Sequence, residues 1–399
     1  MNEALILAGG LATRLGEASV NVPKCLQLVA GRPFLDHLLW DVSRYGFDRV
    51  VLCTGHLHDV VESHVGDGSA FGLEVVYSRE PKPLGTGGAL ALASPLVQGE
   101  EVLVLNGDSL IDCNYLDLAL SRRSAEADVA LALRDVVDVG RFGAVQLDGD
   151  AVAAFGEKSL RGEGLASAGA YVASSAWVRS LPQGPSSLEA DHFPILVQRG
   201  KIAGRGYHGV FVDIGTPDSL VAAQAEVAAW RRKPCAFLDR DGVMNEDRGH
   251  VHSASEFRWL PGMPDAIKML NDAGWLVVVV TNQAGIGRGY YSAQEFKEFT
   301  GWVDGELRRV GAHVDATYYC PHHPTAGEGE YLRDCDCRKP APGMFLRAID
   351  EWQPDLVRSF ALGDKASDIE AAEAAGVRGV RYTGGDIVQL VSGLVAGAS

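Results

Sequence analysis

The sequence predicts an α/β fold with two domains, each built on a mostly parallel, Rossmann-like sheet with helices on both faces. Two observations lead to this prediction. Short apolar runs end at Gly, Asn or Asp and alternate with helix-like stretches along the whole chain. Because these runs contain few polar residues, they are typical of strands buried on both sides, which occur mainly in parallel sheets.

The alternating pattern begins twice along the chain. Residues 4–7 form the first apolar run of the first series. A second series starts with the apolar run 236–238, after a short basic segment that ends at a proline. The sequence therefore predicts a domain over 1–230, a linker over 231–233 and a second domain over 234–399.

The composition is that of a globular protein, with 47% hydrophobic and 22% charged residues. The net charge of −16 argues against nucleic acid or an anionic membrane as a partner. No apolar run approaches the ~20 residues of a membrane span, and the start of the chain lacks the basic residues of a secretion signal. Seven cysteines are too few for a disulfide scaffold. We therefore expect a cytoplasmic protein that binds small molecules, and a homo-oligomer is compatible with the sequence.

Acidic and cationic side chains follow the predicted strands of the second half. Asp239 and Asp241 come after one apolar run, Thr281 after another and Asp364 after a third, while Lys339 lies between the last two. Ligand sites of parallel sheets lie at the carboxyl ends of the strands. One aspartate can attack phosphorus, and a second can protonate the leaving oxygen and then deprotonate water. Asp364 would complete an oxygen site for Mg²⁺, and Thr281 and Lys339 would hold the phosphoryl oxygens.

In these motifs and their order, the second half resembles the haloacid dehalogenase superfamily of aspartate-nucleophile phosphatases. The resemblance implies that Asp239 is the nucleophile and Asp241 the general acid and base. It implies that Mg²⁺ is held by Asp239, Asp364 and the backbone carbonyl of Asp241. Lys365 and Asp368 would organise their loop. The resemblance further implies a set of phosphate-binding residues, namely Thr281, Asn282, Arg338 and Lys339.

Three cysteines and a histidine lie close together as Cys320-x-His322 and Cys335-x-Cys337. Three thiolates and one imidazole suit a closed tetrahedral Zn²⁺ site, which is structural because it leaves no open position. The intervening insert is rich in Gly and charge and would need a metal to fold. His323 is the competing ligand, and the resemblance favours His322.

Two groups within the superfamily share such a zinc loop, the histidinol-phosphate phosphatases and the heptose 1,7-bisphosphate phosphatases. The segment 281–290 resembles the heptose enzymes, in which an arginine such as Arg288 is followed by aromatic residues such as Tyr290 and Tyr291. The second half is therefore expected to hydrolyse a phosphate ester of heptose 1,7-bisphosphate.

Glycine-rich and cationic segments follow the first strand of the first half. Gly9 and Gly10 end the apolar run, and Arg14 and Lys24 come shortly afterwards. Glycine lets the backbone approach a triphosphate, and the two cations would bind its phosphates or the leaving pyrophosphate. The motif is not that of a kinase P-loop. A second glycine loop over 83–90 would hold a nucleoside through main-chain groups.

Two carboxylates far apart in the first half offer a second Mg²⁺ site. Asp108 ends one apolar run within Asn-Gly-Asp, and Asp213 ends another within Val-Asp-Ile-Gly. Between them, Glu157, Lys158 and Gly169 lie in segments that suit sugar hydroxyls and a sugar phosphate. Two carboxylates that hold Mg²⁺ between reacting phosphates meet the needs of nucleotidyl transfer, which requires no protein nucleophile.

Together these segments resemble the sugar-1-phosphate nucleotidyltransferases. Residues 141–143 and 211–217 resemble most the D-glycero-D-manno-heptose 1-phosphate guanylyltransferases, which implies GTP as co-substrate. The family has glycine where this chain has Ala12. The resemblance implies Mg²⁺ ligation by Asp108 and Asp213 and sugar-phosphate binding by the three residues between them. It further implies that the triphosphate is contacted by Gly9, Gly10, Arg14 and Lys24. The nucleoside would be contacted by Gly85, Thr86 and Gly88.

The two chemistries combine into one expected pathway. A nucleotidyltransferase needs the phosphate at C1 of the sugar as its nucleophile, so a phosphatase in the same chain must remove a phosphate elsewhere. Heptose 1,7-bisphosphate offers that choice at C7. The sequence therefore predicts a bifunctional enzyme of nucleotide-activated heptose biosynthesis, whose products, as the resemblance implies, feed bacterial surface glycans.

Two alternatives stay open at this point. The chain could join a phosphatase of the histidinol-phosphate type to a mannose- or glucose-1-phosphate nucleotidyltransferase. Alternatively, the first domain could be a non-catalytic sensor of sugar nucleotides that regulates the phosphatase, and Ala12 is the residue that supports this alternative.

Overall fold

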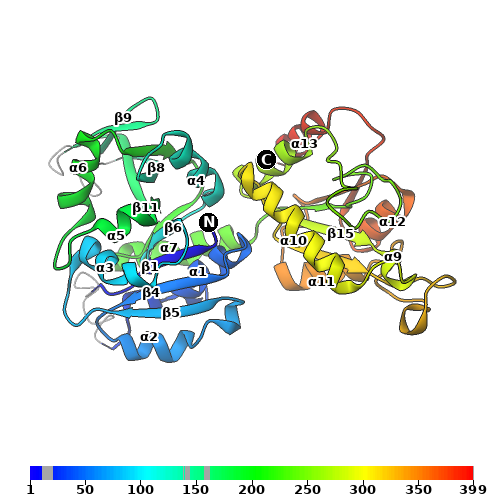
Figure 1. Ribbon diagram of the computed structural model, residues 1–399, viewed down its shortest axis with the longest axis horizontal. Helices are drawn as coiled ribbons and strands as arrows, with labels where there is room; N and C mark the ends of the chain where they lie inside the picture. Colours follow the sequence, from blue (N-terminus) through cyan, green and yellow to red (C-terminus); the bar gives the residue numbers. More distant parts are fainter. Residues whose placement is uncertain (11–20, 138, 140–143, 157–161, 399) are drawn as a thin grey trace. The chain divides into compact units, whose positions relative to one another are not determined.

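The computed structural model describes residues 1–398 except 11–20, 138, 140–143 and 157–161. The chain forms two compact units, Met1–Trp230 and Arg231–Ser399. Both units combine helices with sheets that contain parallel strands, which confirms the predicted α/β class (Figure 1). Among the described helices, none is both long and apolar enough to cross a membrane.

Strands and helices alternate along the first unit, and strands dominate its second half. In chain order its elements are β1 (Glu3–Leu7), η2 (Lys24–Leu26), β2 (Leu28–Val29), β3 (Arg32–Pro33), α1 (Phe34–Arg44), β4 (Arg49–Thr54), α2 (His58–Val65), η3 (Ser69–Phe71), β5 (Glu74–Arg79), α3 (Gly85–Ala93), η4 (Ser94–Leu96), β6 (Glu101–Asn106), β7 (Ser109–Ile111), α4 (Tyr115–Ser124), β8 (Val129–Val136), β9 (Ala144–Asp148), β10 (Ala151–Phe155), β11 (Gly164–Ser174), α5 (Ser175–Ser180), η5 (Leu188–His192), α6 (Phe193–Gln198), β12 (Ile202–Gly206), β13 (Phe211–Asp213) and α7 (Pro217–Arg231).

The main sheet of the first unit has nine strands in the order β5-β4-β1-β6-β11-β8-β12-β10-β9. The expected parallel pairing holds for β5, β4, β1 and β6, and again for β8 with β12. The other pairs are antiparallel. One reason is local, because β9 and β10 are joined by a tight reversal at Gly149, whose φ is +60°. This sheet is therefore mixed rather than mostly parallel.

Helices cover both faces of this sheet, as expected. Side chains of β1 alternate between the faces, so that Ala4 and Ile6 enter one core while Leu5 enters the other. Helices α1, α4 and α7 pack on the first face, and α3, α5 and α6 pack on the second. Both faces of the parallel strands are buried as a result, which explains why their sequences are continuously apolar.

The second unit has a five-stranded sheet in the order β16-β15-β14-β17-β18, and all of its pairs are parallel. Helices α8, α10 and α13 contribute to the core on one face, and α11 and α12 to the core on the other. In chain order the elements of this unit are β14 (Cys235–Leu238), α8 (Met263–Asp272), β15 (Leu276–Asn282), α9 (Ala284–Gly287), α10 (Ala293–Arg309), β16 (Ala316–Cys320), η6 (Gly329–Tyr331), α11 (Gly343–Trp352), β17 (Phe360–Gly363), α12 (Ala366–Ala374), β18 (Arg378–Arg381) and α13 (Ile387–Ala396).

Strand order decides which polar residues meet in each unit. In the second unit β14 lies between β15 and β17, so the residues after these three strands share one edge of the sheet. In the first unit β1 lies beside β6, which brings the glycines after β1 close to the Asn-Gly-Asp segment that ends β6. The Gly107 amide donates to the Leu7 carbonyl across this junction, at 2.9 Å.

A buried ion pair within α1 is hydrogen-bonded to α4 on the first face of the sheet in the first unit. Arg44 Nε donates to Asp41 Oδ1 at 2.7 Å, and the Tyr115 hydroxyl donates to Asp41 Oδ2 at 2.7 Å. The side chains of Arg44 and Asp41 are each 1% exposed. Because removal of one partner would leave the other charge buried, this pair is sensitive to substitution even if its net contribution to folding is small.

We predict that Asp41→Ala lowers the free energy of unfolding of the first unit by about 3 kcal/mol, because the buried Arg44 loses its carboxylate at 2.7 Å and keeps Asp112 at 3.9 Å, while the Tyr115 hydroxyl loses its acceptor. Urea denaturation, followed by circular dichroism, measures the change. Glu62→Ala is the control, because Glu62 pairs with Arg79, whose side chain is 60% exposed. Equal losses of stability in the two variants would contradict this account of the buried pair.

Candidate active sites

A pocket of about 360 Å³ lies at the carboxyl ends of β14, β15 and β17 in the second unit. Its lining combines carboxylates, cations and amides from segments that are far apart in sequence. The lining residues are Asp239, Asp241, Asp247, Gly249, His250, Thr281, Asn282, Gln283, Ala284, Arg288, Arg338, Lys339, Lys365, Ser367 and Asp368.

The ammonium of Lys339 lies among acceptors at the base of this pocket. Its Nζ is 2.8 Å from Asp239 Oδ1, 2.7 Å from Asp368 Oδ1 and 2.8 Å from the Val280 carbonyl. The Lys339 side chain is 2% exposed, and those of the two aspartates are 7% exposed. Burial raises the pKa of Asp239 to about 6, although Lys339 opposes that shift. Burial opposes the charge of Lys339, but the two carboxylates together raise its pKa.

Three carboxylates of the pocket could share a cation. Asp239, Asp364 and Asp368 each offer an oxygen within 4.8 Å of the other two. Asp364 Oδ1 is buried and has no hydrogen-bond partner among the described residues. Burial raises the pKa of Asp364. Carboxylate oxygens are the ligands that Mg²⁺ prefers, and Asp364 keeps one that accepts from no donor in the described part of the chain, so the residues present fit that ion.

The glycine after Asp241 makes this arrangement possible. Gly242 has a φ of +94°, and a side chain at this position would collide with the Asp364 carboxylate. Asp368 does more than organise its loop, because it accepts from the Lys365 amide at 2.9 Å and also pairs with Lys339. The sequence signal for Asp368 was its position four residues after Asp364, on the first turn of α12.

The other expected phosphate-binding residues line the pocket with distinct contacts. Asn282 bridges the backbone of Lys339, since its amide donates to the Lys339 carbonyl and accepts from the Lys339 amide, each at 3.1 Å. The Thr281 hydroxyl accepts from Gln283 at 2.9 Å. Arg338 donates to the His322 carbonyl at 3.0 Å, which ties the pocket to the cysteine-rich loop.

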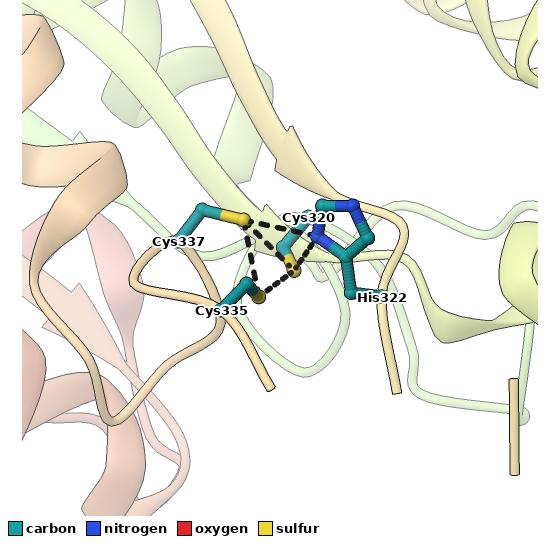
Figure 2. Close-up of side chains that lie close together, drawn as sticks. All are labelled: Cys320, His322, Cys335 and Cys337. Atoms are coloured by element: carbon teal, nitrogen blue, oxygen red, sulfur yellow. Dashed lines mark hydrogen bonds between the residues drawn. The ribbon is translucent and has the colours of Figure 1, made fainter. Parts of the chain in front are cut away.

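The cysteine-rich loop brings Cys320, His322, Cys335 and Cys337 together (Figure 2). The sulfur atoms are 3.3–3.6 Å apart, and His322 Nδ1 is 3.3 Å from Cys337 Sγ and 3.7 Å from Cys320 Sγ. A tetrahedron with Zn–S bonds of ~2.3 Å has edges of about 3.8 Å, close to these separations. His323 lies elsewhere, because its Nδ1 accepts from the amides of Thr325 and Ala326.

The first unit has its own pocket of about 410 Å³ at the carboxyl ends of β1 and β6. Of the expected nucleotide-binding residues, it includes both glycines after β1 and the first residues of α3. Its lining residues are Leu7, Ala8, Gly9, Gly10, Lys24, Cys25, Glu80, Pro83, Gly85, Thr86, Ala89, Asn106, Gly107 and Asp108.

Lys24 forms a short ion pair with Asp108 in this pocket. Asp213 comes to the same place through the pairing of β13 with β7, in which Asp213 faces Ser109 and the Ile214 amide donates to the Asp108 carbonyl at 3.0 Å. A Cβ placed on Gly215 would be 2.9 Å from Asp213 Oδ1 and 3.3 Å from Lys24 Nζ. The structure thus brings Lys24, Asp108 and Asp213 together.

The second glycine loop only partly matches the expectation. Gly85 and Thr86 line the pocket, although the Thr86 hydroxyl donates to Glu189 and accepts from the Leu188 amide. Gly88 does not line it. Its amide donates to the Ser186 carbonyl at 3.2 Å, and a side chain there would collide with the Gly184 carbonyl. Gly88 therefore packs against the 184–186 segment, and its expected contact with the nucleoside stays a prediction.

Gly169 lies beside the floor of this pocket, where a side chain would press on Asn106. Its φ of +75° places it in a region that favours glycine. Arg14, Ala12, residues 141–143, Glu157 and Lys158 lie outside the described residues. Their expected contacts with phosphates or sugar therefore have no structural counterpart here.

The two units are similar to two different groups of known proteins. Residues 3–229 match the family model described as nucleotidyl transferase, and residues 336–387 match the one described as HAD-hydrolase-like. The D-glycero-beta-D-manno-heptose-1,7-bisphosphate 7-phosphatase of Haemophilus ducreyi is 49% identical over 147 residues, which are 37% of this chain and 80% of that protein. The enzyme of the same name from Vibrio cholerae is 50% identical over 145 residues, or 36% and 78% of the two chains.

A solved structure resembles the first unit. HddC from Yersinia pseudotuberculosis, crystallised in complex with GMP-PN, is 29% identical with a TM-score of 0.51, and the match covers 57% of this chain and all of that one. The chain belongs to the nucleotidyl transferase family in its first unit and to the HAD-type heptose-bisphosphate phosphatases in its second. It is thus a bifunctional enzyme, a nucleotidyltransferase and a phosphomonoesterase, whose substrates are sugar phosphates and nucleotides.

The two pockets also contain residues that the sequence analysis did not single out. In the phosphatase unit these are Asp247, His250 and Gln283, which come from loops without a recognisable local motif. In the nucleotidyl transferase unit Glu80 stands out, since its Oε2 accepts from the Leu84 amide at 2.9 Å and burial raises its pKa. The Glu-Pro-x-Pro run before the glycine loop was the signal for Glu80.

We predict that His322→Asn loses zinc to a chelator at a concentration at which the parent chain retains it, because one of four converging ligands is removed. Metal analysis by mass spectrometry after dialysis measures the retained zinc. His323→Asn is the matched control, one residue away and outside the cluster, and should retain the metal. Loss of zinc from the His323 variant alone would show that the ligand assignment is reversed.

Proposed function

We propose that the second unit hydrolyses the 7-phosphate of D-glycero-D-manno-heptose 1,7-bisphosphate, and that the first unit transfers GMP from GTP to the resulting heptose 1-phosphate. The cluster of Asp239, Asp364, Asp368 and Lys339 carries the proposal, because its carboxylates and ammonium suit phosphoryl transfer and the unit is 49% identical over 147 residues to a heptose-bisphosphate phosphatase. The order of the reactions follows from chemistry, since the C1 phosphate must survive to act as nucleophile.

In the phosphatase reaction Asp239 attacks phosphorus and forms an aspartyl phosphate, while the bond from phosphorus to the C7 oxygen breaks. Asp241 donates a proton to that leaving oxygen. Asp241 then takes a proton from water as the water attacks the same phosphorus, so that inorganic phosphate leaves and Asp239 is regenerated. Lys339 and Thr281 bind the phosphoryl oxygens, and Lys339 also balances the charge of Asp239.

Asp239, Asp364 and the backbone carbonyl of Asp241 would hold Mg²⁺ in this pocket, and the acceptor left free on Asp364 supports this assignment. The ion would neutralise charge on the phosphoryl group. The four-residue cysteine and histidine cluster would hold Zn²⁺ in a structural role. Arg338 and Lys339 follow its last ligand directly, so an ordered loop fixes where both cations enter the pocket.

In the nucleotidyl transfer an oxygen of the sugar 1-phosphate attacks the α-phosphorus of GTP, and pyrophosphate leaves. Gly9 and Gly10 would approach the triphosphate through their backbone, and Lys24 would stabilise the charge that develops on the phosphates. Asp108 and Asp213 would hold Mg²⁺ there, with Lys24 released from its ion pair when the phosphates arrive. The similarity to HddC, which was crystallised with GMP-PN, supports GTP as the nucleotide.

Both proposed substrates are small phosphorylated metabolites, and we therefore propose that the enzyme acts in the cytoplasm. The sensor alternative for the first unit is less favoured, because Lys24, Asp108 and Asp213 are brought together as catalysis requires. Pyrophosphate release from GTP and heptose 1-phosphate distinguishes the two, since a sensor would bind nucleotide without releasing it.

We predict that Asp239→Asn lowers release of inorganic phosphate from the bisphosphate by at least about a thousandfold, because a carboxamide cannot form the acyl phosphate. Pyrophosphate release from GTP and heptose 1-phosphate should stay within about twofold of the parent. Asp108→Ala is the reciprocal variant and should show the opposite pattern. Loss of both reactions in either folded variant would contradict two independent sites.

We predict that kcat/KM for heptose 1,7-bisphosphate exceeds that for histidinol phosphate by at least about a hundredfold, because the second unit is related to phosphatases of the bisphosphate. Initial rates of phosphate release with each compound give the ratio. Mannose 1,6-bisphosphate serves as a second comparison, since it also carries two phosphates. A preference for histidinol phosphate would overturn the proposed substrate.

A further inference from the structure

The proposed general acid and base of the phosphatase, Asp241, accepts hydrogen bonds from three side chains. Arg240 Nη2 donates to both carboxylate oxygens, at 2.8 and 3.0 Å, and Asn245 Nδ2 donates to Oδ1 at 3.0 Å. Gln283 Nε2 donates to Oδ2 at 3.2 Å. The Asp241 side chain is 16% exposed, so most of its surface faces these donors rather than water.

Two of these donors, Arg240 and Asn245, are fixed by the surrounding protein. Arg240 also donates to the Val251 carbonyl at 2.5 Å, and its guanidinium lies 5.6 and 5.5 Å from the ring centres of Phe296 and Phe299. Asn245 is completely buried. These contacts leave Arg240 and Asn245 little freedom to move away from Asp241.

The third donor, Gln283, is hydrogen-bonded to a further side chain, Tyr291. An amide can present either its oxygen or its nitrogen to a neighbour. The Tyr291 hydroxyl donates to Gln283 Oε1 at 2.7 Å, which leaves the Gln283 nitrogen to face Asp241 and the Thr281 hydroxyl. If the amide turned over, its oxygen would meet the Asp241 carboxylate. A tyrosine hydroxyl can donate or accept, so the Asp241 carboxylate decides which end of the amide faces it, and the hydrogen bond from Tyr291 holds the amide in that orientation.

Tyr291 is itself held in place. Its ring stacks on His252, with centroids 4.6 Å apart and planes 8° apart, and the residue is 4% exposed. A side chain at Gly285 would collide with the ring, so glycine is needed there. Burial raises the pKa of Tyr291 to about 12, which keeps its hydroxyl proton available to donate.

We propose that Tyr291 and Gln283 are positioning residues that aim the carboxyl group of Asp241 at the leaving oxygen. This inference rests on the proposed role of Asp241 as general acid. Tyr291 acts through Gln283 alone, and neither residue exchanges a proton with the substrate. Proton donation matters when the leaving group is a sugar alkoxide, and it matters little when the leaving group is a nitrophenolate, which departs without a proton.

The experiment measures kcat/KM for two esters with the full chain and Mg²⁺. Heptose 1,7-bisphosphate has a leaving group that needs a proton, and 4-nitrophenyl phosphate has one that does not. Because kcat/KM reports the steps up to departure of the leaving group, it isolates the acid step from hydrolysis of the aspartyl phosphate. The variants are Tyr291→Phe, Gln283→Leu, their combination, and Asp241→Asn as the reference.

Asp241→Asn is expected to lower kcat/KM for the bisphosphate by about 100- to 10,000-fold, and to lower it much less for the aryl ester. Tyr291→Phe should lower it about tenfold for the bisphosphate, corresponding to one lost hydrogen bond, and less than about twofold for the aryl ester. In the Gln283→Leu background Tyr291→Phe should have almost no further effect, because the partner through which it acts is gone.

Tyr382→Phe is the control, since it removes the hydroxyl of a tyrosine of the same unit that donates to the Gly385 carbonyl at 2.8 Å and does not line the pocket. It should leave both rate constants unchanged. If Asp241→Asn affects both esters equally, the acid role of Asp241 fails and the inference fails with it. If Asp241→Asn is selective for the bisphosphate but Tyr291→Phe is not, the inference alone is overturned. Additive effects in the double variant would also overturn it.

Discussion

One buried cation holds the phosphatase site together. Lys339 lies within 2.8 Å of Asp239 and of Asp368, and both carboxylates are nearly excluded from water. Without a cation, two buried carboxylates this close would repel each other and take up protons. The neighbouring segments fix the lysine, since Asn282 binds its backbone on both sides and the cysteine cluster ends at Cys337. Lys339 thus joins the cysteine-rich loop to the clustered carboxylates.

The first unit solves a similar electrostatic problem with a different topology. Lys24 meets Asp108 and Asp213, and the second aspartate arrives through the short antiparallel pair of β7 and β13. The ammonium of Lys24 balances the charge of Asp108. Once phosphates bind, the same ammonium would face them instead. A lysine beside two carboxylates therefore suits a site that binds and releases phosphate groups.

The strands that could be predicted from the sequence are those whose apolar runs end in polar motifs. A parallel strand that is buried on both faces is recognisable because its residues are continuously apolar. Asp239, Thr281 and Asp364 were found in this way, and strand order explains why they meet. The mixed half of the first sheet was not predicted, since strands such as β9 and β10 are short and partly exposed. The contacts of Gln283 and Tyr291 were also missed, because each depends on a contact between loops that no local pattern encodes.

The central claim is that two separate pockets act in turn on one sugar. The most direct test is mass analysis of the products after the full chain is incubated with heptose 1,7-bisphosphate, GTP and Mg²⁺. The account predicts a guanosine diphosphate heptose without a phosphate at C7, with inorganic phosphate and pyrophosphate released in equal amounts. A sugar nucleotide that still carries the C7 phosphate, or release of phosphate with no sugar nucleotide at all, would contradict it.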